Sequence, residues 1–211
     1  MSSRHCATER RSIEGPAGAI EAVIEDPGAS ETAFAVVCHP HPRFGGTMEN
    51  KVVTTLARAF HETGMPTVRF NFRGVGGSEG TYDAGVGETG DADAAAAWGE
   101  RRWPGRPLVI AGFSFGAYVA LRLTQRRKPQ RLITVAPPVA RFDFRTLESP
   151  QVPWLIIQGD ADEVADPAAV RGWAESLLPK PRLVFMPGVG HFFHGRLNEL
   201  RAVVTEEIRS G

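Results

Sequence analysis

A glycine–serine–glycine pattern near the middle of the chain could place a nucleophilic hydroxyl on a sharp turn. A short apolar run, Leu108 to Ala111, precedes Gly112-Phe113-Ser114-Phe115-Gly116, and small and apolar residues at helical spacing follow. This order predicts a buried strand, a tight turn and a packed helix. A serine on such a turn stands exposed above the carboxyl edge of the sheet, ready to attack a carbonyl carbon. We predict Ser114 as a nucleophile; the alternative is a structural turn serine.

A serine nucleophile needs a general base, and the base needs an acid that fixes its tautomer. In an open parallel sheet these groups gather beyond the carboxyl ends of the strands. Acidic residues follow the apolar run 154–158, and Asp162 is the predicted orienting acid. Asp160, one step off the strand, could instead brace the turn, and solvated loop charges are the other interpretation.

The general base is expected after the apolar run 182–186. His191 follows a glycine in a loop that can swing back over the sheet, so we predict it as the base. His194 is the second choice and could be a surface residue. The chain order is then Ser114, Asp162, His191, with each residue just after a predicted strand. The N–H of Phe115, at the positive end of the predicted helix, is expected to bind the oxyanion that forms during attack.

Strands alternate with helices along most of the chain, which predicts a mainly parallel sheet covered on both faces. The expected strands are Ala19–Ile24, Ala33–Cys38, Thr67–Phe72, Leu108–Ala111, Leu132–Ala136, Trp154–Gln158 and Arg182–Met186. The expected helices are Asn50–His61, Asp91–Arg101, one starting at Ala117, Pro167–Leu178 and Arg196–Arg209. Residues 1–15 are predicted as a loosely ordered tail and residues 16–211 as one domain.

The order of these groups resembles that of the α/β-hydrolases, over roughly residues 18–208. More narrowly, the chain is similar to small, lidless bacterial hydrolases that carry a His-Pro-His-Pro segment (residues 39–42), followed by Gly-Gly-Thr-Met (residues 45–48), and a loop like residues 71–78. The resemblance implies a three-layer sandwich with a mostly parallel central sheet and a minimal or absent cap. It also implies a serine hydrolase that acts on esters or related acyl compounds.

In this superfamily a second oxyanion donor comes from the loop after the strand that here ends at Cys38. By position, the N–H of His41 matches that donor, whereas the flanking prolines have no N–H. Phe44 and Gly45 remain alternatives. Many relatives have His-Gly in this loop, and the present chain departs from that pattern.

Several residues could shape the substrate pocket. Phe44 and Phe192 are candidates for an apolar wall, with core packing as the alternative. Arg43 and Arg73 could favour a carboxylate or phosphate on the substrate, although pairing with nearby acids is the simpler interpretation. Residues 137–153, where larger hydrolases insert a cap, are too few for a lid and predict a short lip over an open site.

A metal site is the main chemical alternative for the histidines. His39, His41, His191 and His194 could combine with Asp162 as zinc ligands. Residues two apart in an extended segment point in opposite directions, so His39 and His41 are not expected to converge. We expect one of them to pack under the loop and the other to face the cleft, with no metal and no cofactor.

Composition excludes several classes of function. The 211 residues carry no formal net charge, which gives no global attraction to nucleic acid or anionic membranes. Cys6 and Cys38 are the only cysteines, so a disulfide framework is not expected. No signal peptide or bilayer-length apolar run is visible.

The expectation is a cytoplasmic esterase acting on a small acyl substrate, with its oligomeric state open. Thioesterase, peptidase and acyltransferase activities share the same groups, and a non-catalytic binding protein is the rival of another class.

Overall fold

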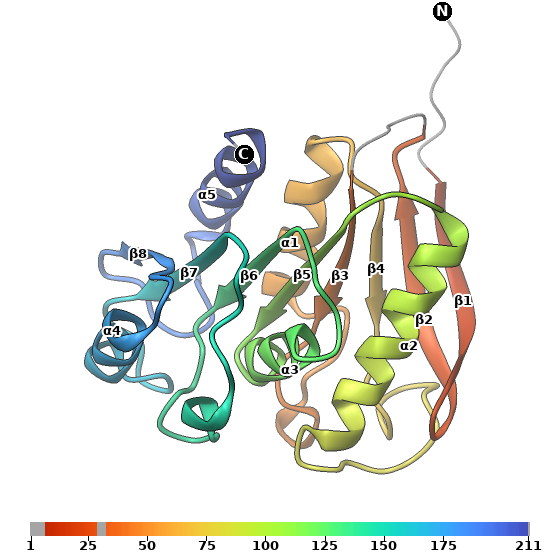
Figure 1. The fold of residues 1–211 in the computed structure, drawn as a ribbon, viewed down its shortest axis with the longest axis horizontal. Coiled ribbons are helices and arrows are strands. Elements are labelled where there is room, and N and C mark those ends of the chain that lie inside the picture. Colours follow the sequence, from red (N-terminus) through yellow and green to blue (C-terminus); the bar gives the residue numbers. More distant parts are fainter. Residues whose placement is uncertain (1–6, 29–32, 211) are drawn as a thin grey trace, which may run out of the picture.

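The computed structural model describes residues 7–28 and 33–210. One eight-stranded sheet runs through the molecule in the order β1-β2-β4-β3-β5-β6-β7-β8 (Figure 1). The β1–β2 and β2–β4 pairs are antiparallel and every other pair is parallel, which confirms the mainly parallel sheet. The strands are β1 (Ala7–Gly15), β2 (Gly18–Asp26), β3 (Phe34–Cys38), β4 (Thr67–Phe70), β5 (Leu108–Phe113), β6 (Arg131–Val135), β7 (Trp154–Gly159) and β8 (Arg182–Met186).

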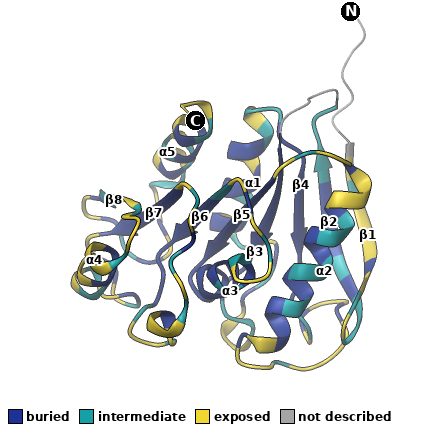
Figure 2. Cartoon of the chain, in the orientation of Figure 1, coloured by how far each residue is buried: buried dark blue, intermediate teal, exposed yellow. Residues whose placement is uncertain are grey.

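Helices cover both faces of this sheet, so the molecule has the three layers expected from the sequence (Figure 1). Helices α1 (Lys51–Glu62) and α5 (Leu197–Arg209) pack on one face. Helices α2 (Val86–Arg102), α3 (Phe115–Thr124) and α4 (Pro167–Ser176) pack on the other. The central strands are buried on both faces, and exposed residues lie mainly on the outer sides of helices and in loops (Figure 2).

Strand β3 shows how the sequence divides the core. Its five residues are all buried, and they alternate between the two faces of the sheet because successive side chains of a strand point to opposite sides. Phe34, Val36 and Cys38 join the cluster under α2, α3 and α4. Ala35 and Val37 join the cluster under α1 and α5. Cys38 is thus a small buried core residue with a free thiol, as predicted.

The prediction of a loose tail over residues 1–15 is wrong where the structure describes that segment. Ala7–Gly15 forms β1, which pairs antiparallel with β2 in a hairpin register that sets Ile13 opposite Ile20. The strand lies at the edge of the sheet, and most of its described side chains are polar and exposed. Such an edge strand lacks the apolar alternation that sequence patterns detect. Cys6 and the other residues before Ala7 lie outside the described part of the chain.

Helix α2 begins at Val86, five residues before the predicted start. The Glu88 carboxylate accepts hydrogen bonds from the N–H groups of Asp83 and Gly85, at 2.8 and 2.7 Å, and so caps the first turn. Gly87 leaves room there for the Arg73 side chain, since a Cβ at that position would lie 2.1 Å from Nη1 of Arg73. Glycine is a poor helix former, which explains why the sequence pattern missed this turn.

Residues 137–153, called the lip below, connect β6 to β7. The lip contains only the short 3-10 turn Phe144–Thr146, and Phe144 is buried in the core. The site beneath it therefore has no cap domain. In the described part of the chain, no helix has the length and apolarity to cross a bilayer.

Candidate active site

Ser114 lies on the tight turn between β5 and α3, in a backbone conformation that favours glycine (φ 55°, ψ −120°). A Cβ at Gly112 would lie 2.1 Å from the Gly116 carbonyl oxygen. One at Gly116 would lie 2.2 Å from the carbonyl oxygen of Cys38, at the end of β3. The two glycines therefore allow the close packing that the turn requires. The strand–turn–helix order predicted for this segment is confirmed.

His191 reaches Ser114 from the loop after β8. Its Nε2 lies 3.0 Å from Ser114 Oγ, and the imidazole is almost fully buried beside the ring of Phe113. Its Nδ1 lies 2.9 Å from Asp162 Oδ2. Because the carboxylate accepts a hydrogen bond from the Nδ1–H group, Nε2 carries no proton and is the acceptor that faces the serine hydroxyl.

Asp162 lies in the turn after β7, with its side chain fully buried. Its Oδ1 accepts the N–H groups of Val164 and Ala165, at 2.8 and 2.7 Å. Burial raises the pKa of the carboxyl, but the hydrogen bonds from His191 and from these two N–H groups outweigh it and hold the pKa below its ordinary value. Asp162 is therefore a carboxylate at neutral pH.

Gln158 also holds Asp162 in place, and the sequence analysis missed it. Its Nε2 donates to Asp162 Oδ2 at 3.0 Å and to the carbonyl oxygens of Gly159 and Ala165. The signal was present, since Gln158 is a polar residue at the carboxyl end of an otherwise apolar strand. A polar side chain in such a place is expected to support the adjoining loop.

A pocket of about 300 Å³ opens onto Ser114 and His191. Its walls include the predicted residues Phe44 and Phe192, and also Arg141 from the lip, which the sequence analysis did not single out. This volume is at the small end of the range for ligand pockets. Larger hollows lie beside α1 and α5, but no serine–histidine pair lines them.

The loop after β3 forms one wall of this pocket. Four consecutive N–H groups in it donate to atoms of His41 or Pro42, namely those of Arg43, Phe44, Gly45 and Gly46. Within the described residues the N–H of His41 has no acceptor. Phe44 and Gly45, the alternative oxyanion donors, thus have their N–H groups occupied.

The His41 side chain fixes its own loop. Its Nδ1 accepts the Arg43 N–H at 3.1 Å, and its Nε2 lies 3.1 Å from the Tyr82 hydroxyl. The ring packs against Phe44, Tyr82, Phe115 and Phe142. Burial, together with the nearby Arg43 guanidinium, lowers the pKa of His41. The neutral ring is therefore a structural part of the pocket wall.

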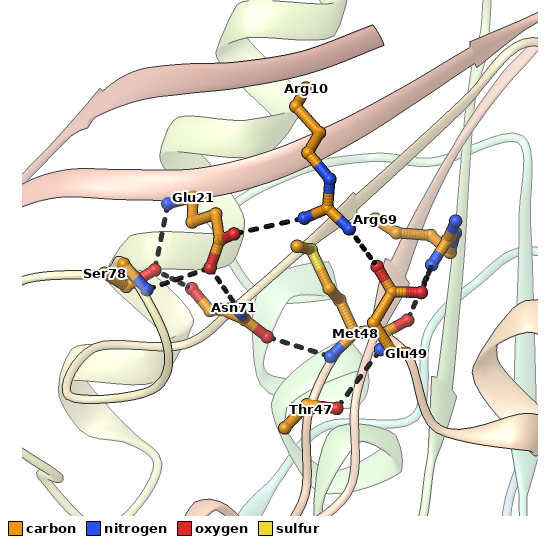
Figure 3. A network of polar contacts seen from close by, with 9 residues as sticks. Arg10, Glu21, Thr47, Met48, Glu49, Arg69, Asn71 and Ser78 are labelled. Atoms are coloured by element: carbon orange, nitrogen blue, oxygen red, sulfur yellow. Dashed lines mark hydrogen bonds and ion pairs between the residues drawn. The ribbon is translucent and has the colours of Figure 1, made fainter. Parts of the chain in front are cut away.

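The far end of the same loop is held by the polar network in Figure 3. Asn71 Oδ1 accepts the Met48 N–H at 2.9 Å, and Asn71 Nδ2 donates to the Glu21 carboxylate at 2.8 Å. The N–H of Gly77 also donates to Glu21 and is the main cause of its lowered pKa. Arg69 donates to the Met48 carbonyl oxygen at 2.8 Å. Strands β2 and β4 thereby fix the position of the loop that lines the pocket.

Known proteins are similar to this chain in both sequence and fold. A model of the family described as "Serine aminopeptidase, S33" matches residues 33–147. A lidless α/β serine hydrolase from Xanthomonas campestris has 44% identity and a TM-score of 0.91, covering 100% of this chain and 96% of its own. The chain belongs to the α/β serine hydrolases.

Two further relatives match this hydrolase over a comparable share of its length. An α/β serine hydrolase homologue from Coxiella burnetii has 46% identity and a TM-score of 0.90, covering 94% of this chain and 96% of that one. An uncharacterised protein of Rickettsia prowazekii is 34% identical over 204 residues, which is 92% of this chain and 86% of the relative. The likeness therefore extends over nearly the whole hydrolase.

Asp160 and His194, the alternative acid and base, lie outside the hydrogen-bonded group formed by Ser114, His191 and Asp162. Asp160 Oδ1 accepts the Gly188 N–H at 2.6 Å, so it braces the loop before His191. His194 is exposed and its ring contacts that of Phe192. The structure thus brings together Ser114, His191 and Asp162. Neither Asp160 nor His194 joins this group.

The candidate role of Arg73 in substrate binding is wrong, and the simpler interpretation, pairing with an acid, is the one that the structure shows. Its guanidinium forms a two-pronged ion pair with the buried Asp91 of α2, with distances of 2.7 and 3.0 Å, and it does not line the pocket. Arg43 is also absent from the pocket lining, and its guanidinium lies 5.8 Å from the ring centroid of Tyr82. The two arginines that were candidates for binding an anionic substrate thus both lie outside the pocket lining.

The histidines do not form a metal cluster in the part of the hydrolase that the structure describes, where no three His, Cys, Asp or Glu side chains are grouped to hold an ion. His39 is buried under the loop, whereas His41 lines the pocket. The expected division between a packed histidine and one facing the cleft is confirmed.

Proposed function

We propose that this hydrolase cleaves small carboxylic esters through an acyl-enzyme on Ser114. The observation that carries the proposal is the continuous chain of hydrogen bonds from Ser114 Oγ to His191 Nε2 (3.0 Å) and from His191 Nδ1 to Asp162 (2.9 Å). A hydroxyl, an imidazole and a carboxylate in this order activate a serine for attack on a carbonyl carbon.

In the first step His191 Nε2 removes the hydroxyl proton as Ser114 Oγ bonds to the carbonyl carbon. The positive charge that develops on His191 is stabilised by the Asp162 carboxylate, which also keeps the imidazole in the required tautomer. His191 then gives the proton to the departing alkoxide, and the alcohol leaves. Water repeats the sequence on the acyl-enzyme and releases the acid.

The tetrahedral intermediate carries a negative charge on the former carbonyl oxygen. We assign its binding to the N–H groups of Phe115 and His41. Phe115 begins α3, so its N–H has no acceptor within the helix and points along the positive end of the helix dipole. His41 lines the pocket, and its N–H has no acceptor among the described residues, whereas the N–H groups of residues 43–46 are occupied. Two such donors are the usual requirement for stabilising an oxyanion.

The pocket favours an ester over the substrate of an aminopeptidase. A free ammonium group on a substrate needs a carboxylate partner, but no Asp or Glu lines the described pocket, and Arg141 would repel a cation. The small volume and the absence of a cap favour short acyl groups that enter from solvent. Long lipid chains would extend beyond the walls.

The experiment is hydrolysis of 4-nitrophenyl esters from acetate to decanoate by the wild type and by Ser114→Ala. The proposal predicts turnover that is highest for short chains and that falls at least about 10⁴-fold in the variant. Turnover at the wild-type rate in a folded and uncontaminated Ser114→Ala preparation would exclude the proposed nucleophile. Absence of turnover on every ester in the folded wild type would exclude a general esterase.

A further inference from the structure

Arg141 is the single arginine or lysine that lines the described pocket beside Ser114, and no acidic residue lines it. The residue comes from the lip between β6 and β7. It therefore contributes the one fixed positive charge on the walls where a substrate must bind.

The side chain of Arg141 is oriented by the protein. Its Nε donates to the Val164 carbonyl oxygen at 3.2 Å, and Val164 also lines the pocket. The N–H of Val164 donates in turn to Asp162, so Arg141 is attached to the loop that carries the proposed catalytic acid. A tethered guanidinium loses less side-chain entropy on binding a ligand than a free one.

The two terminal nitrogens of Arg141 have no carboxylate partner among the described residues. Two other arginines of the chain differ in this respect, since Arg73 is paired with Asp91 and Arg69 with Glu25 and Glu49. The planar fork of an arginine matches a carboxylate, and its remaining donors are free to bind one.

Apolar surface lies beside this charge. Phe44 is 83% exposed and Phe192 45% exposed, and both line the pocket. Large exposed apolar side chains at a pocket are typical of a surface that a ligand covers. The walls thus combine aromatic faces with one unpaired cation.

From this combination we infer that the physiological substrate is an ester with an apolar body and a carboxylate group, which Arg141 binds while Phe44 and Phe192 cover the body. The inference rests on the proposed esterase function and narrows its substrate class. Arg141 acts as a specificity residue, because it contacts a part of the substrate that does not react.

The test compares two matched pairs of esters, in each of which one member carries a carboxylate and the other carries its neutral methyl ester. One pair, 4-acetoxybenzoate and its methyl ester, carries the carboxylate on the leaving group. The other, mono-4-nitrophenyl adipate and its methyl ester, carries it on the acyl group. The measured quantity is the ratio of kcat/KM for the anionic ester to kcat/KM for the neutral ester. Comparison of this ratio between variants cancels the different chemical reactivities of the two esters.

We expect the ratio to fall about tenfold in Arg141→Gln for at least one pair. A loss of this size is typical when a charge-assisted contact near the surface is removed. Arg141→Lys should retain part of the preference because it keeps the charge and loses the fork. The control is Arg145→Gln, since Arg145 is an exposed arginine of the same lip that does not line this pocket. It should leave the ratio unchanged. Added salt should lower the wild-type ratio.

The inference is overturned if both ratios stay within about twofold of wild type in Arg141→Gln while the neutral esters are still hydrolysed in a Ser114-dependent manner. That outcome would leave the esterase proposal intact. If the folded wild type hydrolyses neither member of either pair, the proposed function fails and this inference fails with it.

Discussion

The backbone N–H of Phe72 donates a hydrogen bond of 2.9 Å to Nε2 of His39. His39 Nδ1 lies 2.6 Å from the carbonyl oxygen of Pro40, to which it donates, so both ring nitrogens are used by the neutral side chain. The ring also packs on Phe72. This contact ties the start of the pocket loop to the end of β4. The adjacent residue Asn71 holds the other end of the loop through Met48.

The burial of His39 has a consequence for stability in acid. Burial lowers the pKa of His39 from 6.5 to about 3 in the folded protein. Between these values the unfolded chain binds a proton that the folded chain does not, so stability is present above pH 6.5 and is lost as the pH falls toward 3. The free energy of unfolding should decrease by up to about 1.4 kcal/mol per pH unit from this residue.

Urea unfolding of the wild type and of His39→Gln from pH 7 to pH 4 measures this effect. Glutamine can accept the Phe72 N–H but does not titrate. We expect a shallower dependence of the free energy of unfolding on pH in the variant, whatever its stability at pH 7. Equal slopes for the two proteins would show that His39 is not the acid-sensitive group.

Asn71→Ala should destabilise the protein and slow the enzyme. The substitution leaves the buried N–H of Met48 without its acceptor, which costs about 1–3 kcal/mol, and removes one of the donors to the Glu21 carboxylate. Because only the Arg69 contact to the Met48 carbonyl oxygen then holds this end of the pocket loop, kcat should fall more than KM changes. Chemical denaturation and ester kinetics measure the two effects. The control is Thr47→Ala in the same loop, whose hydroxyl accepts only an exposed N–H. A normal kcat in destabilised Asn71→Ala would disprove the positioning role.

Asp162→Asn should reduce kcat by about 10⁴-fold with the fold retained. The amide can still accept the N–H groups of Val164 and Ala165, but its NH₂ group would face His191 Nδ1 and favour the unproductive tautomer. Asp160→Asn is the matched control, because Asp160 lies two residues away and bonds only the Gly188 N–H in the loop before His191. Its kcat should stay within a few fold of wild type. A larger loss in Asp160→Asn than in Asp162→Asn would reverse the assignment of the acid.

Gly116→Ala should destabilise the turn that carries Ser114. Its Cβ would meet the Cys38 carbonyl oxygen at 2.2 Å, and a backbone atom cannot move aside as a flexible side chain can. We expect a loss of about 2–3 kcal/mol. Gly172→Ala is the control, since Gly172 lies exposed in α4 with nothing near its added Cβ. That substitution should stabilise the protein by about 0.5–1 kcal/mol. Similar thermal midpoints for the two variants would argue against the tight packing at Gly116.

The central group of residues could be predicted because each lies just beyond a strand. Apolar runs identified the strands, and the parallel arrangement brought Ser114, Asp162 and His191 to one edge of the sheet. The local motif added the glycines that the turn needs. These features depend on short-range sequence patterns, which a single sequence records well.

Features that depend on long-range pairing could not be predicted. Pairing of Arg73 with an acid was expected, but the partner could not be identified, because Asp91 lies 18 residues away on the helix that packs over the sheet. β1 was missed because only one face of an edge strand packs, and that face shows little apolar pattern. Arg141 lies in an irregular segment, where no periodicity indicates which side chains face the pocket.

The most direct test of the account is the reaction of the folded protein with a fluorophosphonate, followed by mass spectrometry of its peptides. An activated serine displaces fluoride and keeps the phosphonyl group, whereas an ordinary serine does not react. We predict one adduct, on the peptide that contains Ser114. It should be absent in Ser114→Ala and form much more slowly in His191→Gln. A folded wild type that forms no adduct, or forms it on another serine, would contradict the assignment of Ser114 as the nucleophile.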